Sequence, residues 1–197
     1  MPSKQTIPYN DGIYFITITC HKWIPLIGKT NSYDVIYKWF DFLKSKRHFI
    51  LDYVLMPNHL HVLIGFRNSD KSINKIVGDG KRFIAYEIVK RLKAQKEIII
   101  LNELENAVEH KDRQRNKKHE VWEDSFDWKE CISHKFINQK IEYMHNNPCT
   151  GKWNLSLNPI EYQHSSARFY LTGEHNYPVT NFMELDDVDL TKKLSGG

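Results

Sequence analysis

Runs of apolar, β-branched and aromatic residues between polar segments predict three strands in the first third of the chain. Residues 12–20 are rich in β-branched and aromatic side chains and follow the turn-forming sequence Asn-Asp-Gly. Two further apolar runs, residues 49–56 and 59–66, are separated only by Pro57 and Asn58, a connection short enough for a hairpin. These two strands are therefore expected to pair antiparallel.

Two longer segments repeat their apolar residues with helical spacing. Residues 32–47 carry them at i, i+3, i+4 and i+7, the stripe of an amphipathic helix. Residues 69–96 carry a similar stripe, but Gly78-Asp79-Gly80 interrupts it. Each glycine inside a helix costs about 1 kcal/mol, so a kink or break is expected there. Beyond a short apolar stretch, the polar run 109–119 is expected to form an exposed loop.

The next segments complete the core. Residues 121–132 alternate large and polar side chains, which predicts a strand that returns to the sheet. Ser133 is a suitable N-cap for a helix over residues 135–147, and Pro148 would end that helix. The order β-α-β-β-α-β-α predicts an α+β fold, a ferredoxin-like antiparallel sheet with helices on one face, to which the last helix is an addition.

The sequence predicts one domain and an appendage. Residues 1–155 would form the domain, and residues 156–197 a C-terminal arm packed on it, with an acidic, frayed end from Glu184. The odd number of widely spaced cysteines, three in all, fits a reducing compartment. The polar N-terminus and the lack of any run of roughly 18 apolar residues give no signal peptide or membrane span, so we expect a cytoplasmic protein.

His59 and His61 stand two residues apart in an otherwise apolar strand. Side chains alternate between the faces of a strand, so both imidazoles would share one face, with Leu60 and Val62 on the other. Two neighbouring imidazoles can bind one divalent cation or together grip a phosphate. The alternative is two separately hydrogen-bonded histidines. Burying two such groups without a partner is costly, which favours a shared ligand.

Tyr143 and Asn147 lie four residues apart on the last predicted helix, and hence on one face of it. The amide oxygen of Asn147 would suit a hard cation such as Mg²⁺ or Mn²⁺. The phenol of Tyr143 could act as a covalent nucleophile. By itself the pair is not specific, because a tyrosine is commonly a half-buried ring with its hydroxyl in water.

Taken together, these motifs resemble a known family. Met-Pro-Asn-His-Leu-His at residues 56–61, combined with Tyr-Met-His-Asn-Asn-Pro at residues 143–148, resembles the HUH single-tyrosine transposases, and most closely the REP-associated tyrosine transposase branch. The likeness extends from Tyr14 to about Trp153, and residues 165–170 resemble the C-terminal Ser-Ser-Ala segment of that branch.

The resemblance implies a set of functional residues. Tyr143 matches the nucleophile of the family, and His59, His61 and Asn147 match the residues that hold its divalent metal, Mg²⁺ or Mn²⁺. Many relatives in the wider group have Gln at the position of Asn147. The implied function is metal-dependent cleavage of single-stranded DNA, with strand transfer through a 5′-phosphotyrosine intermediate, as in DNA transposition. The implied partner is single-stranded or hairpin DNA, and the protein would act as a monomer or a homodimer.

A net charge of +4 and an isoelectric point near 8.8 permit nucleic-acid binding without requiring it. The basic residues are concentrated in the segment 69–96 and the polar run 109–119. Such a surface is usually only a solvated helix face, and the alternative is a track for DNA phosphates. The candidate DNA-binding residues are Lys81, Arg82, Lys90, Arg91, Arg113, Arg115, Lys117 and Lys118.

Two other functions fit part of the pattern. A non-enzymatic nucleic-acid-binding module would stack bases on strand aromatics such as Tyr14 and Phe66, but it leaves the histidine pair unexplained. A metal-dependent hydrolase would use His59, His61 and a further histidine such as His145. We expect His145 to face away from Tyr143, because it lies two positions further along the helix. Tyr86, on the basic helix, is the rival nucleophile.

Overall fold

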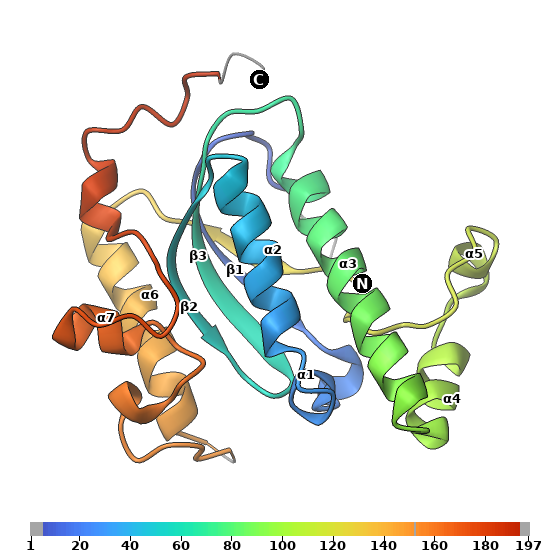
Figure 1. Ribbon diagram of the computed structural model, residues 1–197. Helices are drawn as coiled ribbons and strands as arrows, with labels where there is room; N and C mark the ends of the chain where they lie inside the picture. Colours follow the sequence, from blue (N-terminus) through green and yellow to red (C-terminus); the bar gives the residue numbers. More distant parts are fainter. Residues whose placement is uncertain (1–5, 152, 194–197) are drawn as a thin grey trace.

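The computed structural model describes residues 6–151 and 153–193. Its centre is a four-stranded antiparallel sheet with the strand order β2-β3-β1-β4 (Figure 1). The strands are β1 Gly12–Thr19, β2 Phe49–Leu55, β3 His59–Phe66 and β4 Asp127–Glu130. This order, with a helix after β1 and another after β3, is the expected α+β, ferredoxin-like arrangement.

Seven helices and four short 3₁₀ turns connect or flank the strands within the described residues. The helices are α1 Leu26–Lys29, α2 Tyr33–Ser45, α3 Ile73–Ala94, α4 Ile98–Asn106, α5 His110–Arg113, α6 His134–Asn146 and α7 Ala167–Thr172. The 3₁₀ turns are His21–Trp23, Asn147–Cys149, Pro159–Glu161 and Phe182–Leu185. No helix in this part of the chain is both long and apolar enough to cross a bilayer.

The sheet lies between two helical layers (Figure 1). Helices α2 and α3 cover one face, as the ferredoxin-like arrangement requires, and α6 lies against the other. The strand residues alternate accordingly. Ile16 and Val62 are buried in the core under α2 and α3, whereas Phe15 and Leu63 are buried with Ile141 of α6. A residue on β3 can therefore face α6 only at odd positions such as 59, 61 and 63.

The expected break at Gly78-Asp79-Gly80 is wrong, because α3 continues through it. Gly80 is buried against the Trp39 indole of α2, and a Cβ at this position would overlap that ring. Close packing of the two helices therefore requires a glycine there and compensates for its low helix propensity. At Gly78 a Cβ would meet open space.

Three further expectations need correction. The strand predicted over residues 121–132 is limited to β4, and only an isolated bridge joins Trp122 to Cys20 before it. The polar run 109–119 is not all loop, because α5 forms within it.

The expected frayed end is wrong for residues 184–190, since Leu185 is buried and Leu190 packs against the core beside α6. Residues 1–5 and 194–197, which belong to the two predicted parts of the chain, lie outside the described residues.

Candidate active site

The two histidines of β3 face α6, as their spacing predicts. His59 and His61 retain only 6% and 5% of their exposed area, and their ring centroids are 4.8 Å apart. In the antiparallel register with β1, Thr19 lies opposite His59 and Thr17 opposite His61. Leu60 points to the other face, into the core under α2 and α3. The pair is thus two nearly buried imidazoles side by side at the start of a strand.

Hydrogen bonds fix the Nδ1 atom of each ring. The Asn58 amide is oriented by its Nδ2, which donates to the Trp23 carbonyl at 3.2 Å, so its Oδ1 accepts from His59 Nδ1 at 2.8 Å. His61 Nδ1 is 2.8 Å from Thr17 Oγ1. His61 Nε2 is buried and has no hydrogen-bond partner among the described residues. Metal-binding histidines commonly have one ring nitrogen held in this way and the other directed at the ion.

Both imidazoles are neutral at physiological pH. Burial lowers the pKa of His59 to about 4, against a hydrogen bond with the Asn147 side chain that raises it. Burial lowers the pKa of His61 to about 3, and the nearby His59 and Lys140 lower it further. A neutral imidazole keeps a lone pair, which is the form that binds a metal ion.

Helix α6 brings Tyr143 and Asn147 to this pair. The helix starts as predicted, with Ser133 Oγ accepting from the Phe136 backbone N–H at 3.3 Å. The Tyr143 ring lies 5.2 Å from the His61 ring and is 51% exposed. Asn147 is one turn further on, and its side chain hydrogen-bonds His59. The four residues that two separate motifs supply therefore meet at one place.

The residues at this place fit a divalent cation. Each imidazole has a supported Nδ1 and a neutral ring, and the buried Nε2 of His61 has no hydrogen-bond partner among the described residues. Within the described ranges no group of three or more His, Cys, Asp or Glu side chains could hold a metal ion. The third protein ligand would have to be the neutral amide of Asn147, whose oxygen suits a hard cation.

A buried contact between His145 and Asp52, which sequence reasoning missed, fixes α6 on the sheet. His145 Nε2 lies 3.2 Å from Oδ1 of Asp52, a fully buried residue of β2. Burial raises the pKa of Asp52, and the hydrogen bond with His145 opposes that rise. His145 thus contacts β2, whereas the Tyr143 ring lies beside Phe15 of β1 and His61 of β3. The signal for this pair was the single carboxylate in the apolar strand Phe-Ile-Leu-Asp-Tyr-Val-Leu.

The Ser-Ser-Ala segment completes this anchor. Ser166 Oγ donates to Asp52 Oδ1 and accepts from the Tyr53 backbone N–H at 2.8 Å. The backbone N–H of Ser166 donates to the Tyr53 carbonyl at 3.1 Å, and Ser165 forms a bridge with Val54. The C-terminal arm is therefore bonded to the edge of β2, beside the carboxylate that holds α6.

Lys140 is a second residue that the sequence did not reveal. Its Nζ lies 4.9 Å from the ring centroid of Phe15, 5.1 Å from that of Phe136 and 5.9 Å from that of Tyr143. Such cation–π contacts hold an ammonium group in place without neutralising it. The lysine adds a positive charge beside the exposed tyrosine.

Known proteins share the architecture but little sequence. No protein-family model and no curated protein matches the chain. Among solved structures, the chain is similar to a REP-associated tyrosine transposase bound to a REP hairpin, with a TM-score of 0.59 and 14% identity over 100% of both chains. The chain has the fold of that transposase. A putative transposase from Deinococcus radiodurans R1 is 13% identical over 74% of this chain and 97% of its own, but its TM-score of 0.35 supports no argument.

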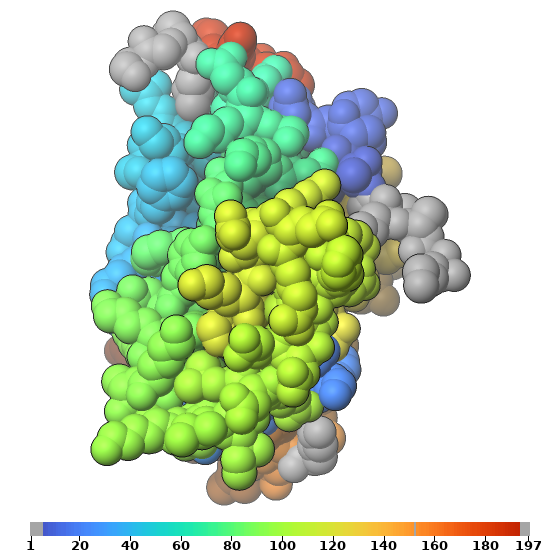
Figure 2. All heavy atoms as spheres, turned by 90° about the vertical axis from the view of Figure 1, so that its right-hand side faces the viewer, coloured from blue at the N-terminus to red at the C-terminus, as the bar shows by residue number. Residues whose placement is uncertain are grey.

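The rival tyrosine lies elsewhere. Tyr86 is 69% exposed on α3, which packs on the opposite face of the sheet from the histidine pair. It lines a groove of about 1300 Å³ between α3 and the segment 112–126. Figure 2 shows this side of the molecule, with α3 in green beside the yellow-green residues of α4 and α5.

Most of the candidate DNA-binding residues line this groove, namely Lys81, Arg82, Lys90, Arg115, Lys117 and Lys118. The other two make contacts within the protein. Arg91 pairs with Asp34 of α2 at 2.8 Å, and Arg113 donates to the carbonyl of Val108 at 3.0 Å. Of the lining residues, Lys117 is paired with Asp112 and Glu120. The groove is basic, but part of its charge is already neutralised.

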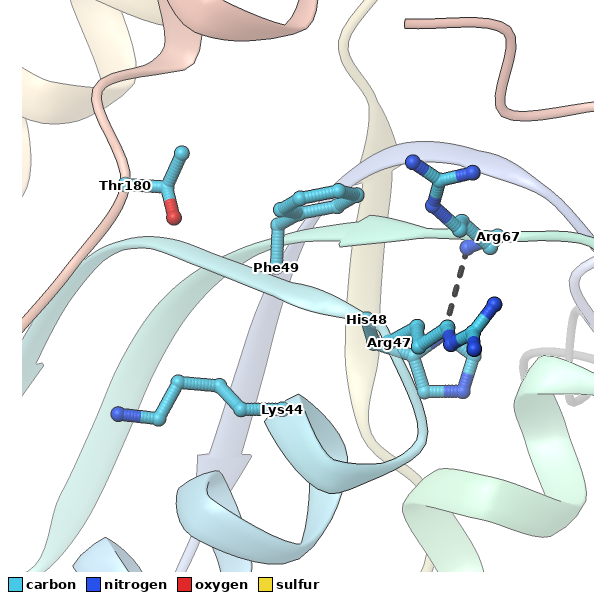
Figure 3. A pocket seen from close by; sticks show the side chains of 6 residues that line it. All are labelled: Lys44, Arg47, His48, Phe49, Arg67 and Thr180. Atoms are coloured by element: carbon cyan, nitrogen blue, oxygen red, sulfur yellow. Dashed lines mark hydrogen bonds between the residues drawn. The ribbon is translucent and has the colours of Figure 1, made fainter.

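A second, smaller hollow lies at the opposite end of β2 and β3 from the histidine pair (Figure 3). Its volume is about 430 Å³, and it is lined by Lys44, Arg47, His48, Phe49, Arg67 and Thr180. His48 Nδ1 accepts from the Arg67 backbone N–H at 3.2 Å, and burial lowers the pKa of this histidine to about 4. Figure 3 shows Lys44 extending away from both arginines, so the three cations do not converge on one point.

The two strand aromatics that a base-stacking module would use cannot contact a nucleobase. Tyr14 and Phe66 are fully buried in the core under α2 and α3. Strand alternation places side chains on one face or the other of the sheet, but it does not show which face the helices cover. A nucleic-acid-binding module that stacks bases on these two rings is therefore ruled out for the described fold.

Proposed function

We propose that the protein cleaves and rejoins single-stranded DNA through a covalent 5′-phosphotyrosine at Tyr143. The observation that carries the proposal is the meeting of an exposed tyrosine with two neutral, nearly buried imidazoles, one of which has a buried nitrogen without a hydrogen-bond partner among the described residues. Most buried polar atoms have a hydrogen-bond partner, so the buried Nε2 of His61, which has none among the described residues, supports a ligand at this nitrogen.

The reaction would be an in-line displacement at phosphorus. The Tyr143 oxygen forms a bond to the phosphorus, and the bond from phosphorus to the 3′ oxygen of the preceding nucleotide breaks. The phenol proton passes to solvent, and the leaving oxygen takes up a proton to give a free 3′-OH. Attack by the 3′-OH of another strand reverses the step and joins two strands. No ATP is required, because the phosphotyrosine conserves the phosphodiester bond energy.

His59, His61 and Asn147 would hold the divalent cation, Mg²⁺ or Mn²⁺. When bound, such a cation polarises the scissile phosphate and offsets the charge that develops on it. The protein's own contribution is positional. Asn58 and Thr17 orient the two rings, the Asp52–His145 pair holds α6, and Lys140 adds a positive charge beside Tyr143.

We infer single-stranded or hairpin DNA as the partner. The transposase that shares the fold is bound to a REP hairpin. The groove beside α3 supplies cations for the phosphates of a stem or a flanking strand. The second candidate function, a non-enzymatic nucleic-acid-binding module, rests on this groove alone and leaves the histidine pair without a role.

The test is a covalent adduct between the protein and DNA. Incubation of labelled hairpin and single-stranded oligonucleotides with Mn²⁺ should give a band that survives SDS, and peptide mapping should locate the DNA on Tyr143. Tyr143→Phe keeps the ring and removes the reacting oxygen, so it should bind DNA and give no adduct. Tyr86→Phe is the matched control and should form the adduct normally. An adduct mapped to Tyr86, or none with any substrate while DNA binds, would favour the alternatives.

A further inference from the structure

An exposed tryptophan stands next to the histidine pair without a role in the chemistry. Trp23 is 54% exposed, and its ring centroid lies 5.5 Å from that of His59, with the ring planes at 68°. The neighbouring Leu26 is fully buried and supplies the apolar contact to the core. The indole is thus not needed to fill the interior, although it is the largest kind of apolar side chain.

The backbone that presents this ring is unusual. Lys22 and Trp23 both have positive φ angles, 48° and 60°, in the left-handed region that side chains other than glycine seldom adopt. Backbone strain of this kind persists only where surrounding contacts determine it, and it is concentrated at functional sites. Two consecutive strained residues at the edge of a candidate active site therefore call for an explanation.

Several hydrogen bonds determine this turn. The Trp23 carbonyl accepts from Asn58 Nδ2, and Asn58 is also the residue that orients His59. One amide thus ties the position of the indole to that of the imidazole. Three further bonds are made by the backbone N–H groups of the turn, His21 N to Val121 O at 2.9 Å, Lys22 N to Glu123 Oε1 at 2.7 Å and Trp23 N to Cys20 O at 2.9 Å.

We propose that Trp23 is a stacking platform for a nucleobase of the DNA strand whose phosphate lies at the histidine pair. The inference rests on the proposed function, which brings a phosphodiester to His59, and the base attached to a neighbouring nucleotide would then lie over the indole. Aromatic rings beside a cationic backbone track are the usual means of holding single strands, and stacking tolerates any base. The ligand class is a nucleobase of single-stranded DNA.

The test compares two strands with the same phosphates. One is a labelled oligothymidylate, and the other is an abasic oligomer of equal length, with affinities measured by fluorescence anisotropy. Trp23→Ala should bind the oligothymidylate about tenfold more weakly than the wild type and the abasic strand equally well. Trp23→Phe should retain most of the affinity. Phe42→Ala, which removes another half-exposed aromatic ring on α2, should change neither affinity.

Two outcomes overturn the proposal. An unchanged affinity of Trp23→Ala for the oligothymidylate would show that no base contacts the ring. An equal loss for both strands would show a backbone contact or a damaged fold. Should Trp23→Ala fold poorly by circular dichroism, Trp23→Leu replaces it, because leucine keeps apolar volume without an aromatic face and should lose the same base-dependent affinity.

The binding test of Trp23 can be distinguished from the test of the proposed covalent chemistry. A protein that forms the Tyr143 adduct, but whose affinity for bases does not depend on Trp23, has the proposed function without this subsite. A protein that forms no adduct, but loses only base-dependent affinity in Trp23→Ala, has the subsite without the proposed chemistry. The two failures therefore give different combinations of the adduct assay and the binding assay.

Discussion

The two faces of the sheet bury different kinds of side chain. Under α2 and α3 the strands contribute aliphatic and aromatic residues, such as Ile16 and Val62. Under α6 the buried strand residues include His59, His61 and Asp52. Burying polar groups costs free energy unless each finds a partner. Both faces bury apolar side chains that stabilise the fold, but the second also retains costly polar groups that stability alone does not explain.

The difference also separates the two exposed tyrosines. Tyr143 and Tyr86 are both exposed on helices, and the sequence favoured Tyr143 only through its resemblance to a known motif. Only Tyr143 belongs to the helix that covers the polar face, where its ring contacts His61. The role proposed for Tyr143 therefore rests on the histidine pair buried beneath its ring.

The largest effect on cleavage is expected from the histidine pair on the face of the sheet under α6, which we call the polar face. His61→Ala and His59→Ala should each reduce Mn²⁺-dependent cleavage by more than about 100-fold, because changes to residues that only support metal ligands already cost about 10–100-fold. Thermal unfolding should show a folded protein, since each substitution removes a buried polar group that stability does not require. Asn147→Ala should be milder, because water can replace a neutral ligand.

Normal cleavage by the double variant His59→Ala, His61→Ala would contradict the metal assignment. The matched control is His48→Ala, which removes a buried histidine of similarly lowered pKa from the hollow at the other end of β2. It should affect stability and leave Mn²⁺ binding unchanged.

A smaller effect is expected from the residue that holds the His61 ring in place. Thr17→Val keeps the shape of the side chain and removes the oxygen that pairs with His61 Nδ1. The affinity for Mn²⁺, measured by isothermal titration calorimetry, should fall by about 10- to 100-fold. Thr19→Val makes the same change opposite His59, whose Nδ1 is held by Asn58 instead, and should leave the affinity nearly unchanged. Equal losses in both variants would mean that the threonines act through packing of β1.

The third prediction concerns the stability of the packing between α2 and α3, on the other face of the sheet. Gly80→Ala should destabilise the protein by about 1–3 kcal/mol, because the new Cβ overlaps the Trp39 indole. Gly78→Ala makes the same change where there is open space, and should stabilise α3 by about 0.5–1 kcal/mol. Urea unfolding of both variants checks the signs. Stabilisation in both variants would mean that helix propensity, and not the contact with α2, decides the outcome, and destabilisation in both would contradict the open space at Gly78.

The same glycines show how far the sequence could predict the fold. Apolar runs were sufficient for β1, β2 and β3, and regular helical stripes were sufficient for α2 and α6. It failed at Gly80, where a contact with Trp39, forty-one positions earlier, overrides local propensity. It also failed at residues 121–126, where alternation is present but pairing is limited to the bridge of Trp122 with Cys20.

For the candidate site, the sequence predicted the motifs better than their surroundings. The spacing of His59 and His61 determined their common face, and the helix spacing brought Tyr143 and Asn147 together. Thr17, Asp52 and Lys140 became visible only through contacts between segments distant in sequence. Such contacts leave at most a weak local signal, such as one carboxylate within an apolar strand.

The smallest effect is expected from the basic groove on the outer side of α3, far from the polar face. Lys118 is exposed there, whereas Lys117 is already paired with Asp112 and Glu120. If DNA phosphates contact this groove, Lys118→Gln should reduce the slope of log affinity against log salt by roughly 0.7–0.9, the value for one released counterion. Lys117→Gln should reduce it less, because its charge is largely neutralised before DNA binds. Both variants should form the Tyr143 adduct at saturating DNA, since neither residue lies at the histidine pair. An affinity that does not depend on salt in the wild type would remove the groove from the DNA path and leave the two faces of the sheet with unrelated roles.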